Sequence, residues 1–221
     1  AVTGLSDSMS PGSISRLGLS GAVAFRAEFS GMAPAPPLRY WRGPIFWHYD
    51  GRTWTIGAER RPTPVNVNLW GEQIDYTITL EPHNQRWLFA LDFPISLPPE
   101  SFMTDDFQVL AVAPARQRLR YQLGSHPRYQ AGMVLSPKQR KDGLQLPEGY
   151  NPRTRQLAGE WRGRAQSDRE IVDMALAAFA NQPFFYTLSP PPLGFHAVDA
   201  FLFETRSGFC EHYAGSFVFL M

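Results

Sequence analysis

Several short segments alternate apolar and polar side chains with a period of two, the pattern of a strand with one buried face. They lie at residues 23–29, 76–80, 87–91 and 119–123. The chain also contains 20 prolines and 18 glycines, which favour short elements joined by turns over long helices. We therefore expect residues 21–125 to form an antiparallel, sandwich-like β domain, preceded by an irregular lead-in at residues 1–20.

Two hairpins are expected within this domain. Residues 45–49 and 52–56 are aromatic and β-branched, and they flank Asp50-Gly51, a dipeptide typical of a two-residue type I′ turn. A second hairpin is expected to join 76–80 to 87–91. The Trp and Tyr side chains could form a platform that stacks on sugars or bases. Filling the space between two sheets is the more common use of such rings, and we favour it.

The pattern changes towards the C-terminal end. Residues 126–166 are rich in Pro, Gly, Arg and Gln and are expected to form a linker or wrapping segment. Ser167 and Glu170 then have the spacing of a helix-capping box, and apolar residues follow at helical spacing as far as Phe179. A short strand or extended segment is expected at 184–188. The chain is thus predicted to be α+β, with residues 167–221 forming a second, helical part.

Composition excludes several classes of function. The formal net charge is +1 and the arginines are scattered, so no basic stripe for nucleic acid is present. No apolar run is long enough to span a bilayer and no signal peptide is visible, so we interpret the chain as a soluble piece of a longer protein. The single cysteine forbids an internal disulfide and a cysteine-based zinc site. We expect no cofactor and no metal.

That cysteine, Cys210, is the strongest candidate for chemistry. Gly208 precedes it and a helix-compatible apolar run follows, so a helix is expected to start at Phe209 or Cys210. This helix should be central and buried, because it is apolar on nearly all sides from Ala214 onward. A thiol in its first turn would lie among unpaired backbone N–H groups, which favour a thiolate and could stabilise an oxyanion. A small buried hydrophobe is the alternative role for Cys210, and spacing alone does not decide.

No histidine of the chain is a convincing base for Cys210. His212 is the nearest in sequence, but residues i and i+2 of a helix lie on different faces. His196 lies upstream, where an ordinary hydrogen-bonded histidine is the more common interpretation. Asp199 and Arg206 flank the segment before the cysteine, and we expect them to pair.

Residues 201–214, Phe-Leu-Phe-Glu-Thr-Arg-Ser-Gly-Phe-Cys-Glu-His-Tyr-Ala, resemble the nucleophile segment of the transglutaminase-like superfamily. Segments 8–14, 40–44, 49–54 and 80–83 are similar to the extracytoplasmic region of bacterial TgpA-like membrane transglutaminases. The resemblance implies a papain-like core with a Cys-His-Asp triad in which Cys210 is the nucleophile. It also implies a parent protein anchored in the bacterial inner membrane, with this region in the periplasm.

The activity that the resemblance implies is acyl transfer. A glutamine carboxamide of a protein or peptide would be the donor, and an amine would be the acceptor. The triad His and Asp follow the cysteine in the family, and the chain ends at Met221. We therefore expect an incomplete core, and we expect this fragment alone to be inactive. A thiol peptidase or amidase using Cys210, and a non-catalytic module that binds periplasmic partners, are the alternatives.

Overall fold

The computed structural model describes residues 6–10, 21–58, 62 and 66–221. Contacts divide the chain into two compact units. The first contains residues 1–7, 20–47 and 56–143, and the second contains residues 8–19, 48–55 and 144–221. The expected division of the chain differs from this one, because residues 48–55 belong to the second unit. Most of the expected lead-in at 1–20 falls outside the described residues.

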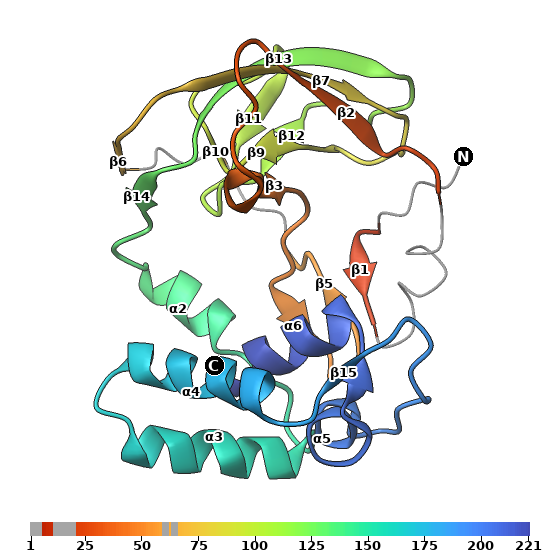
Figure 1. Cartoon of the computed structure of the whole chain (residues 1–221), viewed down its shortest axis with the longest axis vertical. Helices are drawn as coiled ribbons and strands as arrows, with labels where there is room; N and C mark the ends of the chain where they lie inside the picture. The colour runs from red at the N-terminus through yellow and green to blue at the C-terminus, as the bar shows by residue number, and fades with distance from the viewer. Residues whose placement is uncertain (1–5, 11–20, 59–61, 63–65) are drawn as a thin grey trace. The chain divides into compact units, whose positions relative to one another are not determined.

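The first unit is built of antiparallel sheets (Figure 1). Its main sheet has the strand order β10-β13-β7-β2, and a second sheet has the order β11-β12-β8. The strands of these two sheets are β2 (Phe25–Phe29), β7 (Ile74–Leu80), β8 (Trp87–Leu88), β10 (Phe93–Pro94), β11 (Ser101–Met103), β12 (Val109–Ala111) and β13 (Leu119–His126). The smaller elements are η1 (Pro36–Leu38), β3 (Trp41–Arg42), β6 (Val67–Leu69), β9 (Ala90–Leu91), β14 (Tyr129–Ala131) and α2 (Pro137–Gly143).

The core of the first unit lies between strands of both sheets, with buried residues from β7, β8, β9, β12 and β13. Tyr76 and Trp87 are almost completely buried, so these rings fill the core, as the more common interpretation predicted. The buried hydroxyl of Tyr121 accepts from the Phe89 N–H at 3.1 Å and donates to the Phe89 carbonyl at 3.0 Å. These two bonds satisfy the backbone N–H and carbonyl of Phe89, which lies between the short strands β8 and β9. Burial raises the pKa of Tyr121.

Strand positions were predicted better than strand pairings. β2 and β13 follow the expected alternation, and Tyr121 and Leu123 point into the core. The expected hairpin between 76–80 and 87–91 is wrong, because β7 pairs with β2 and β13 while β8 pairs with β12. We expected 76–80 to pair with 87–91 because the two segments are close in sequence. They are connected by a side chain, since the Leu91 N–H donates to the hydroxyl of Tyr76 across the core.

The second unit contains most of the helices. Its elements are β1 (Ser8–Met9), β4 (His48–Tyr49), β5 (Trp54–Thr55), α3 (Pro152–Arg164), α4 (Asp168–Asn181), β15 (Phe185–Tyr186), α5 (Ala197–Ala200), the π-helical turn η2 (Phe201–Thr205), β16 (Ser207–Gly208) and α6 (Cys210–Leu220). Helices α3 and α4 lie side by side in Figure 1. The α+β class and the short strand at 184–188 are thus confirmed. The segment 126–166 is more regular than expected, since it contains all of α2 and all of α3.

The hairpin at Asp50 exists, but its turn is longer than the expected type I′ turn. Tyr49 pairs with Trp54, so four residues, 50–53, connect β4 to β5. The Asp50 carboxylate accepts from the N–H groups of both Arg52 and Thr53, at 2.8 and 2.7 Å. An aspartate that accepts from the backbone N–H two residues ahead stabilises this wider turn. The Asp-Gly pattern alone does not distinguish such a turn from a two-residue type I′ turn.

Helix α4 begins as the sequence predicted. The Ser167 hydroxyl accepts from the Glu170 N–H at 3.2 Å, which is one half of the expected capping box. The Glu170 carboxylate accepts from the Gln166 N–H at 2.7 Å rather than from the Ser167 N–H. The negative side chain still lies at the positive end of the helix dipole.

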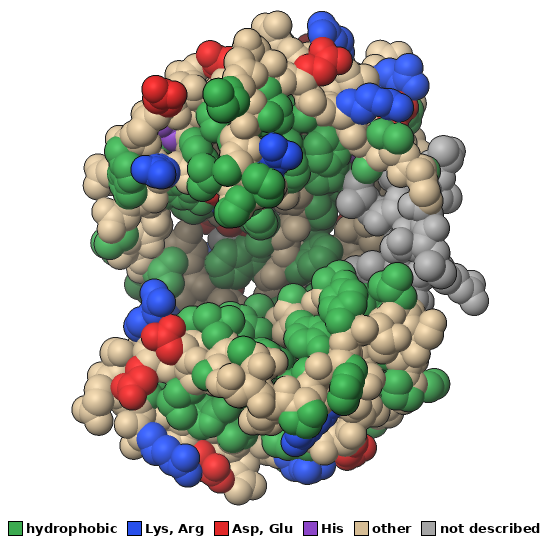
Figure 2. Space-filling view, viewed as in Figure 1, with side chains coloured by type: hydrophobic (Ala, Val, Ile, Leu, Met, Phe, Trp, Pro, Cys, Tyr) green, Lys and Arg blue, Asp and Glu red, His purple; other side chains and the backbone are tan. Residues whose placement is uncertain are grey.

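Exposed charges of both units lie close to charges of opposite sign. Arg118 contacts Glu81 at 3.1 Å in the first unit, and Arg169 contacts Asp173 at 3.0 Å on α4. Figure 2 shows Lys or Arg side chains next to Asp or Glu side chains at several places on one face. Among the described residues, no helix is long and apolar enough to cross a membrane.

Candidate active site at Cys210

Cys210 is the first residue of α6, and the N-cap position before it is Phe209. Phe209 has extended backbone angles, and its side chain has no hydrogen-bond acceptor. The first N–H groups of a helix have no partner within the helix, and the Cys210 N–H forms no hydrogen bond with the described residues. The Gly208 position is tightly enclosed: an added Cβ would lie 2.6 Å from Cγ of His212 and 3.0 Å from Cε2 of Phe201. The predicted start of the helix is confirmed. The close contacts around Gly208 leave no room for a larger side chain.

The thiol of Cys210 is exposed, and no described residue forms a hydrogen bond with it. Helix α6 is buried on one face only, so the expectation that it is buried on nearly all sides is wrong. The buried residues are Glu211, His212, Gly215, Ser216, Phe219 and Leu220. Cys210, Ala214 and Val218 lie on the exposed face, one turn apart. A buried-filler role for Cys210 does not fit this position.

His212 supports the start of α6 from the buried side. Its Nδ1 atom accepts from the Phe209 N–H at 3.4 Å, and its ring packs against Phe209 and Phe201 at centroid distances of 4.7 and 5.6 Å. Burial lowers the pKa of His212 from its usual 6.5, which favours the neutral ring that can accept this bond. The geometry agrees with the argument from helix faces that His212 is not the base for Cys210.

The segment that leads to Cys210 is held in place by a π-helical turn and a pair of short strands. The Arg206 N–H donates to the Phe201 carbonyl at 2.9 Å, five residues back, and Arg206 itself has a left-handed backbone with φ of 48°. Single π-helical turns occur often at functional sites. Strand β16 follows and pairs in parallel with β15, with Tyr186 opposite Gly208. The π-helical turn and the pairing of β15 with β16 therefore fix the backbone that leads to the cysteine.

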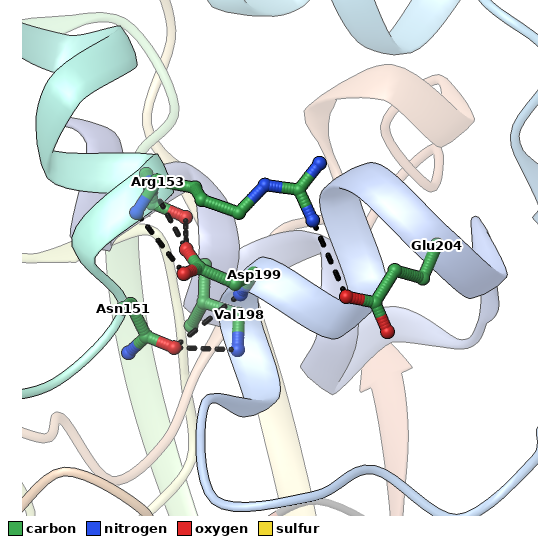
Figure 3. A network of polar contacts seen from close by, with 6 residues as sticks. Asn151, Arg153, Val198, Asp199 and Glu204 are labelled. Carbon is green, nitrogen blue, oxygen red and sulfur yellow. Dashed lines mark hydrogen bonds and ion pairs between the residues drawn. The ribbon is translucent and has the colours of Figure 1, made fainter.

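The expected pair of Asp199 and Arg206 does not form. The Asp199 carboxylate instead accepts from the N–H groups of Arg153 and Thr154, at 3.0 and 2.8 Å, and from the Thr154 hydroxyl at 2.6 Å (Figure 3). These groups form the start of α3, where unpaired N–H donors attract a carboxylate. The Arg206 guanidinium lies over the ring of Phe184, at 5.7 Å from its centroid.

Asn151 is the buried residue that the sequence interpretation missed. Its side-chain oxygen accepts from the N–H groups of Val198 and Asp199, at 3.1 and 3.3 Å, and so caps α5. The Asn151 N–H donates to Nδ1 of His196 at 3.0 Å, which confirms His196 as an ordinary hydrogen-bonded histidine. The dipeptide Asn151-Pro152 was the available signal, because Asn at the N-cap and Pro at the first position mark the start of a helix.

A small cavity of about 30 Å³ lies behind α6, on its buried side. Glu211, His212 and Gly215 of the helix line it, together with Tyr49 and Trp54 of the hairpin. This volume suits one or two waters and is far too small for a peptide. Cys210 is not part of its lining, so any substrate of the thiol must approach from the exposed face. No group of three or more His, Cys, Asp or Glu side chains among the described residues is placed to hold a metal ion.

Comparison with known proteins agrees with the fold and with the sequence resemblance. Residues 1–132 match the family model described as the TgpA N-terminal domain. The chain belongs to the TgpA family. It is 39% identical over all 221 residues to a protein-glutamine gamma-glutamyltransferase of Pseudomonas aeruginosa strain PAO1. The chain spans 33% of the length of that relative.

Two solved structures of a TgpA periplasmic domain match nearly the whole chain. The periplasmic domain of TgpA from Pseudomonas aeruginosa bound to ethylmercury superposes with a TM-score of 0.94 at 39% identity, covering 99% of this chain and 78% of that domain. Another structure of that periplasmic domain gives a TM-score of 0.91 at 38% identity, with 99% and 76% covered. The TgpA-like resemblance and the α+β fold are thereby confirmed.

Proposed function

We propose that Cys210 is the nucleophile of a transglutaminase-like cysteine acyltransferase. The observation that carries the proposal is the position of the chain's single thiol. It is exposed at the first residue of α6, and the Cys210 N–H forms no hydrogen bond with the described residues. Membership of the TgpA family and the name of the 39% identical relative support a transglutaminase-type reaction. A thiolate at a helix start is favoured by the dipole and by nearby N–H donors.

The proposed reaction has two balanced steps. In the first, the Cys210 sulfur attacks the carbon of a glutamine carboxamide, a C–S bond forms, the C–N bond breaks, and the thiol proton leaves on ammonia. In the second, a primary amine attacks the thioester, a new C–N bond forms, the C–S bond breaks, and a proton of the amine returns to the thiol. The Cys210 N–H is placed to stabilise the oxyanion that forms in each step. Water in place of the amine would give hydrolysis.

Residues 1–221 alone are expected to be inactive. The two histidines nearest to Cys210 in sequence each use Nδ1 to accept a backbone N–H, His212 from Phe209 and His196 from Asn151. A nucleophilic cysteine needs a base, and a further group that orients the base. The family resemblance implies a His and an Asp that follow the nucleophile, so we assign these roles to parts of the parent protein outside this chain. Amine incorporation by residues 1–221 would contradict this assignment.

We also propose that this region works in the periplasm and that its parent is anchored in the inner membrane. The support is the 99% coverage of this chain by a structure described as a periplasmic domain. Donors would be glutamine side chains of periplasmic proteins or peptides, and acceptors would be amines such as lysine side chains.

The test uses the full-length protein, a glutamine-containing peptide and a fluorescent primary amine. Wild type should incorporate the amine and release ammonia, and Cys210→Ser should lose activity by about a thousandfold or more with an unchanged circular dichroism spectrum. Cys210→Ser with wild-type turnover would place the nucleophile elsewhere. Peptide cleavage without amine incorporation would instead support the thiol peptidase alternative.

A second readout does not depend on turnover. The relative's periplasmic domain was solved bound to ethylmercury, and mercury is a soft metal that prefers thiolate ligands. Residues 1–221, which contain one cysteine, should therefore gain the mass of one ethylmercury group, while the same residues with Cys210→Ser should gain none.

A further inference from the structure

Strand β15 has one open edge. The Phe185 N–H donates to the Arg206 carbonyl at 2.7 Å, and the Thr187 N–H donates to the Gly208 carbonyl at 2.8 Å, so these groups face β16. In a parallel pair, the N–H and C=O of the residue between them point to the opposite edge. That residue is Tyr186, whose backbone forms no hydrogen bond with the described residues. The open edge thus offers one donor and one acceptor.

The residue at this edge lies close to the segment that leads to the thiol. Tyr186 is opposite Gly208, two residues before Cys210. Its ring stacks on Tyr213 at a centroid distance of 6.1 Å and an interplanar angle of 24°, so the first turn of α6 extends over β15. Tyr213 and Cys210 are three residues apart and are therefore neighbours on the helix surface. Tyr213 therefore links Tyr186 to Cys210 within the second unit.

Each face of β15 carries a large exposed ring. Tyr186 is 67% exposed, and Phe185, on the opposite face of the strand, is 62% exposed. An open strand edge with large exposed rings is a risk for aggregation, and proteins usually protect such an edge unless it binds a partner. Strand addition is a common way to bind an extended peptide: backbone hydrogen bonds provide affinity, and alternate side chains provide specificity.

We infer that the open edge of β15 binds the extended backbone of the glutamine donor, with Tyr186 as its main contact. The Tyr186 N–H and C=O pair with the peptide backbone, and the Tyr186 ring packs against a peptide side chain beside the glutamine. This inference rests on the proposed function of Cys210, since it assigns the substrate of that site to peptides or unfolded segments that can become extended. Free glutamine and folded helical segments would be poor donors.

The first test measures binding without chemistry. It uses the full-length Cys210→Ala variant and a fluorescent nine-residue peptide with a central glutamine, together with copies of the peptide in which one backbone amide at a time is N-methylated. Because the open edge offers one acceptor, the Tyr186 carbonyl, it can take one N–H of the peptide backbone. We expect methylation of that one amide to weaken binding by about tenfold, and methylation at the other positions to change it little. Equal affinities across the series would overturn the inference.

The second test measures turnover by the full-length protein with an otherwise wild-type site. Tyr186→Ala should lower kcat/KM for the nine-residue donor by about fivefold to tenfold, mainly through KM, and should change the value for a blocked glutamine-glycine dipeptide much less. Phe185→Ala is the matched control, because its side chain is equally large and exposed but lies on the opposite face of the strand. Equal losses with both donors, or from both variants, would also overturn the inference.

The two proposals fail differently. The rate at which iodoacetamide alkylates Cys210 should be the same in wild type and Tyr186→Ala, which shows that the thiol is undisturbed. If methylation of one amide weakens peptide binding but no Cys210-dependent turnover occurs with any donor, the proposed function is wrong and the peptide site stands. If Cys210-dependent turnover occurs without dependence on donor length or Tyr186, the function stands and the peptide site is wrong.

Discussion

Asn151 and Asp199 exchange helix caps: the amide oxygen of Asn151 accepts from the start of α5, and the Asp199 carboxylate accepts from the start of α3. Both side chains are buried, and together they satisfy backbone donors of two helices that would otherwise be unpaired in the interior. Since α5 continues directly into the π-helical turn and β16, this exchange holds the segment that carries Cys210.

Asp199→Ala should destabilise the second unit by about 3 kcal/mol, because three hydrogen bonds to a buried carboxylate are lost together. Denaturant unfolding of purified protein measures the change. Glu204→Gln is the control in the same network: Glu204 contacts the Arg153 side chain at 3.2 Å, but both groups are more than half exposed. Such a pair contributes about 0.5 kcal/mol or less. Equal losses of unfolding free energy in the two variants would show that the buried caps stabilise the protein no more than the exposed ion pair does.

Gly208→Ala should destabilise the protein by about 2–3 kcal/mol and slow thiol alkylation, because its Cβ would lie within 3.0 Å of both His212 and Phe201. Gly159→Ala in α3 is the matched control, since an added Cβ there meets nothing within 4 Å. That substitution should stabilise the protein by about 0.5–1 kcal/mol, because alanine is a better helix former than glycine. Thermal unfolding of both variants distinguishes the effects, and a neutral Gly208→Ala would contradict the described packing.

Protein stability should fall as the pH is lowered below 6.5, in part because of His212. Burial lowers the pKa of His212 in the folded state, so the unfolded chain takes up a proton first and its population is favoured. The contribution of His212 is complete above pH 6.5 and is lost as the pH falls through the folded pKa. His83 has a pKa lowered in the same direction and by the same cause, so wild type contains both contributions.

His212→Asn isolates the contribution of His212, because asparagine can accept the Phe209 N–H but does not titrate. The difference in unfolding free energy between pH 7.5 and pH 5.5 should be smaller in this variant than in wild type. An equal difference in the two proteins would mean that His212 does not resist protonation.

Tyr121→Phe should destabilise the first unit by about 2 kcal/mol, because the hydroxyl both donates to and accepts from the backbone of Phe89 in the core. Tyr40→Phe makes the same chemical change at a ring that is 57% exposed, and it should cost less than about 0.5 kcal/mol. Urea unfolding followed by tryptophan fluorescence provides both values. A neutral Tyr121→Phe would mean that the Phe89 backbone finds other partners.

Local features of the chain were predictable where the responsible residues are close in sequence. The Ser167 cap, the alternation in β13 and the start of α6 at Cys210 each depend on neighbours within a few positions. Helix geometry alone also ruled out His212 as the base, because it fixes which side chains share a face. These predictions needed no knowledge of the tertiary structure.

Long-range partners were not predictable from the same patterns. Asp199 bonds residues 45 and 46 positions away. No local rule could therefore show that its partner is the backbone of α3 and not Arg206, which is close in sequence. The partner of β7 likewise depends on which apolar faces pack together, and the short distance to 87–91 in sequence misled the interpretation. The exposure of Cys210 also depends on which face of α6 the rest of the second unit covers.

The exposed position of a single thiol has a practical consequence for spectroscopy. A nitroxide or a small fluorophore attached at Cys210 would report on the surface around Tyr186 and Tyr213 without any cysteine having to be removed. Adding one cysteine at the exposed Val112 of the first unit would then give a spin pair. Electron paramagnetic resonance on that pair would measure the distribution of distances between the two units in solution.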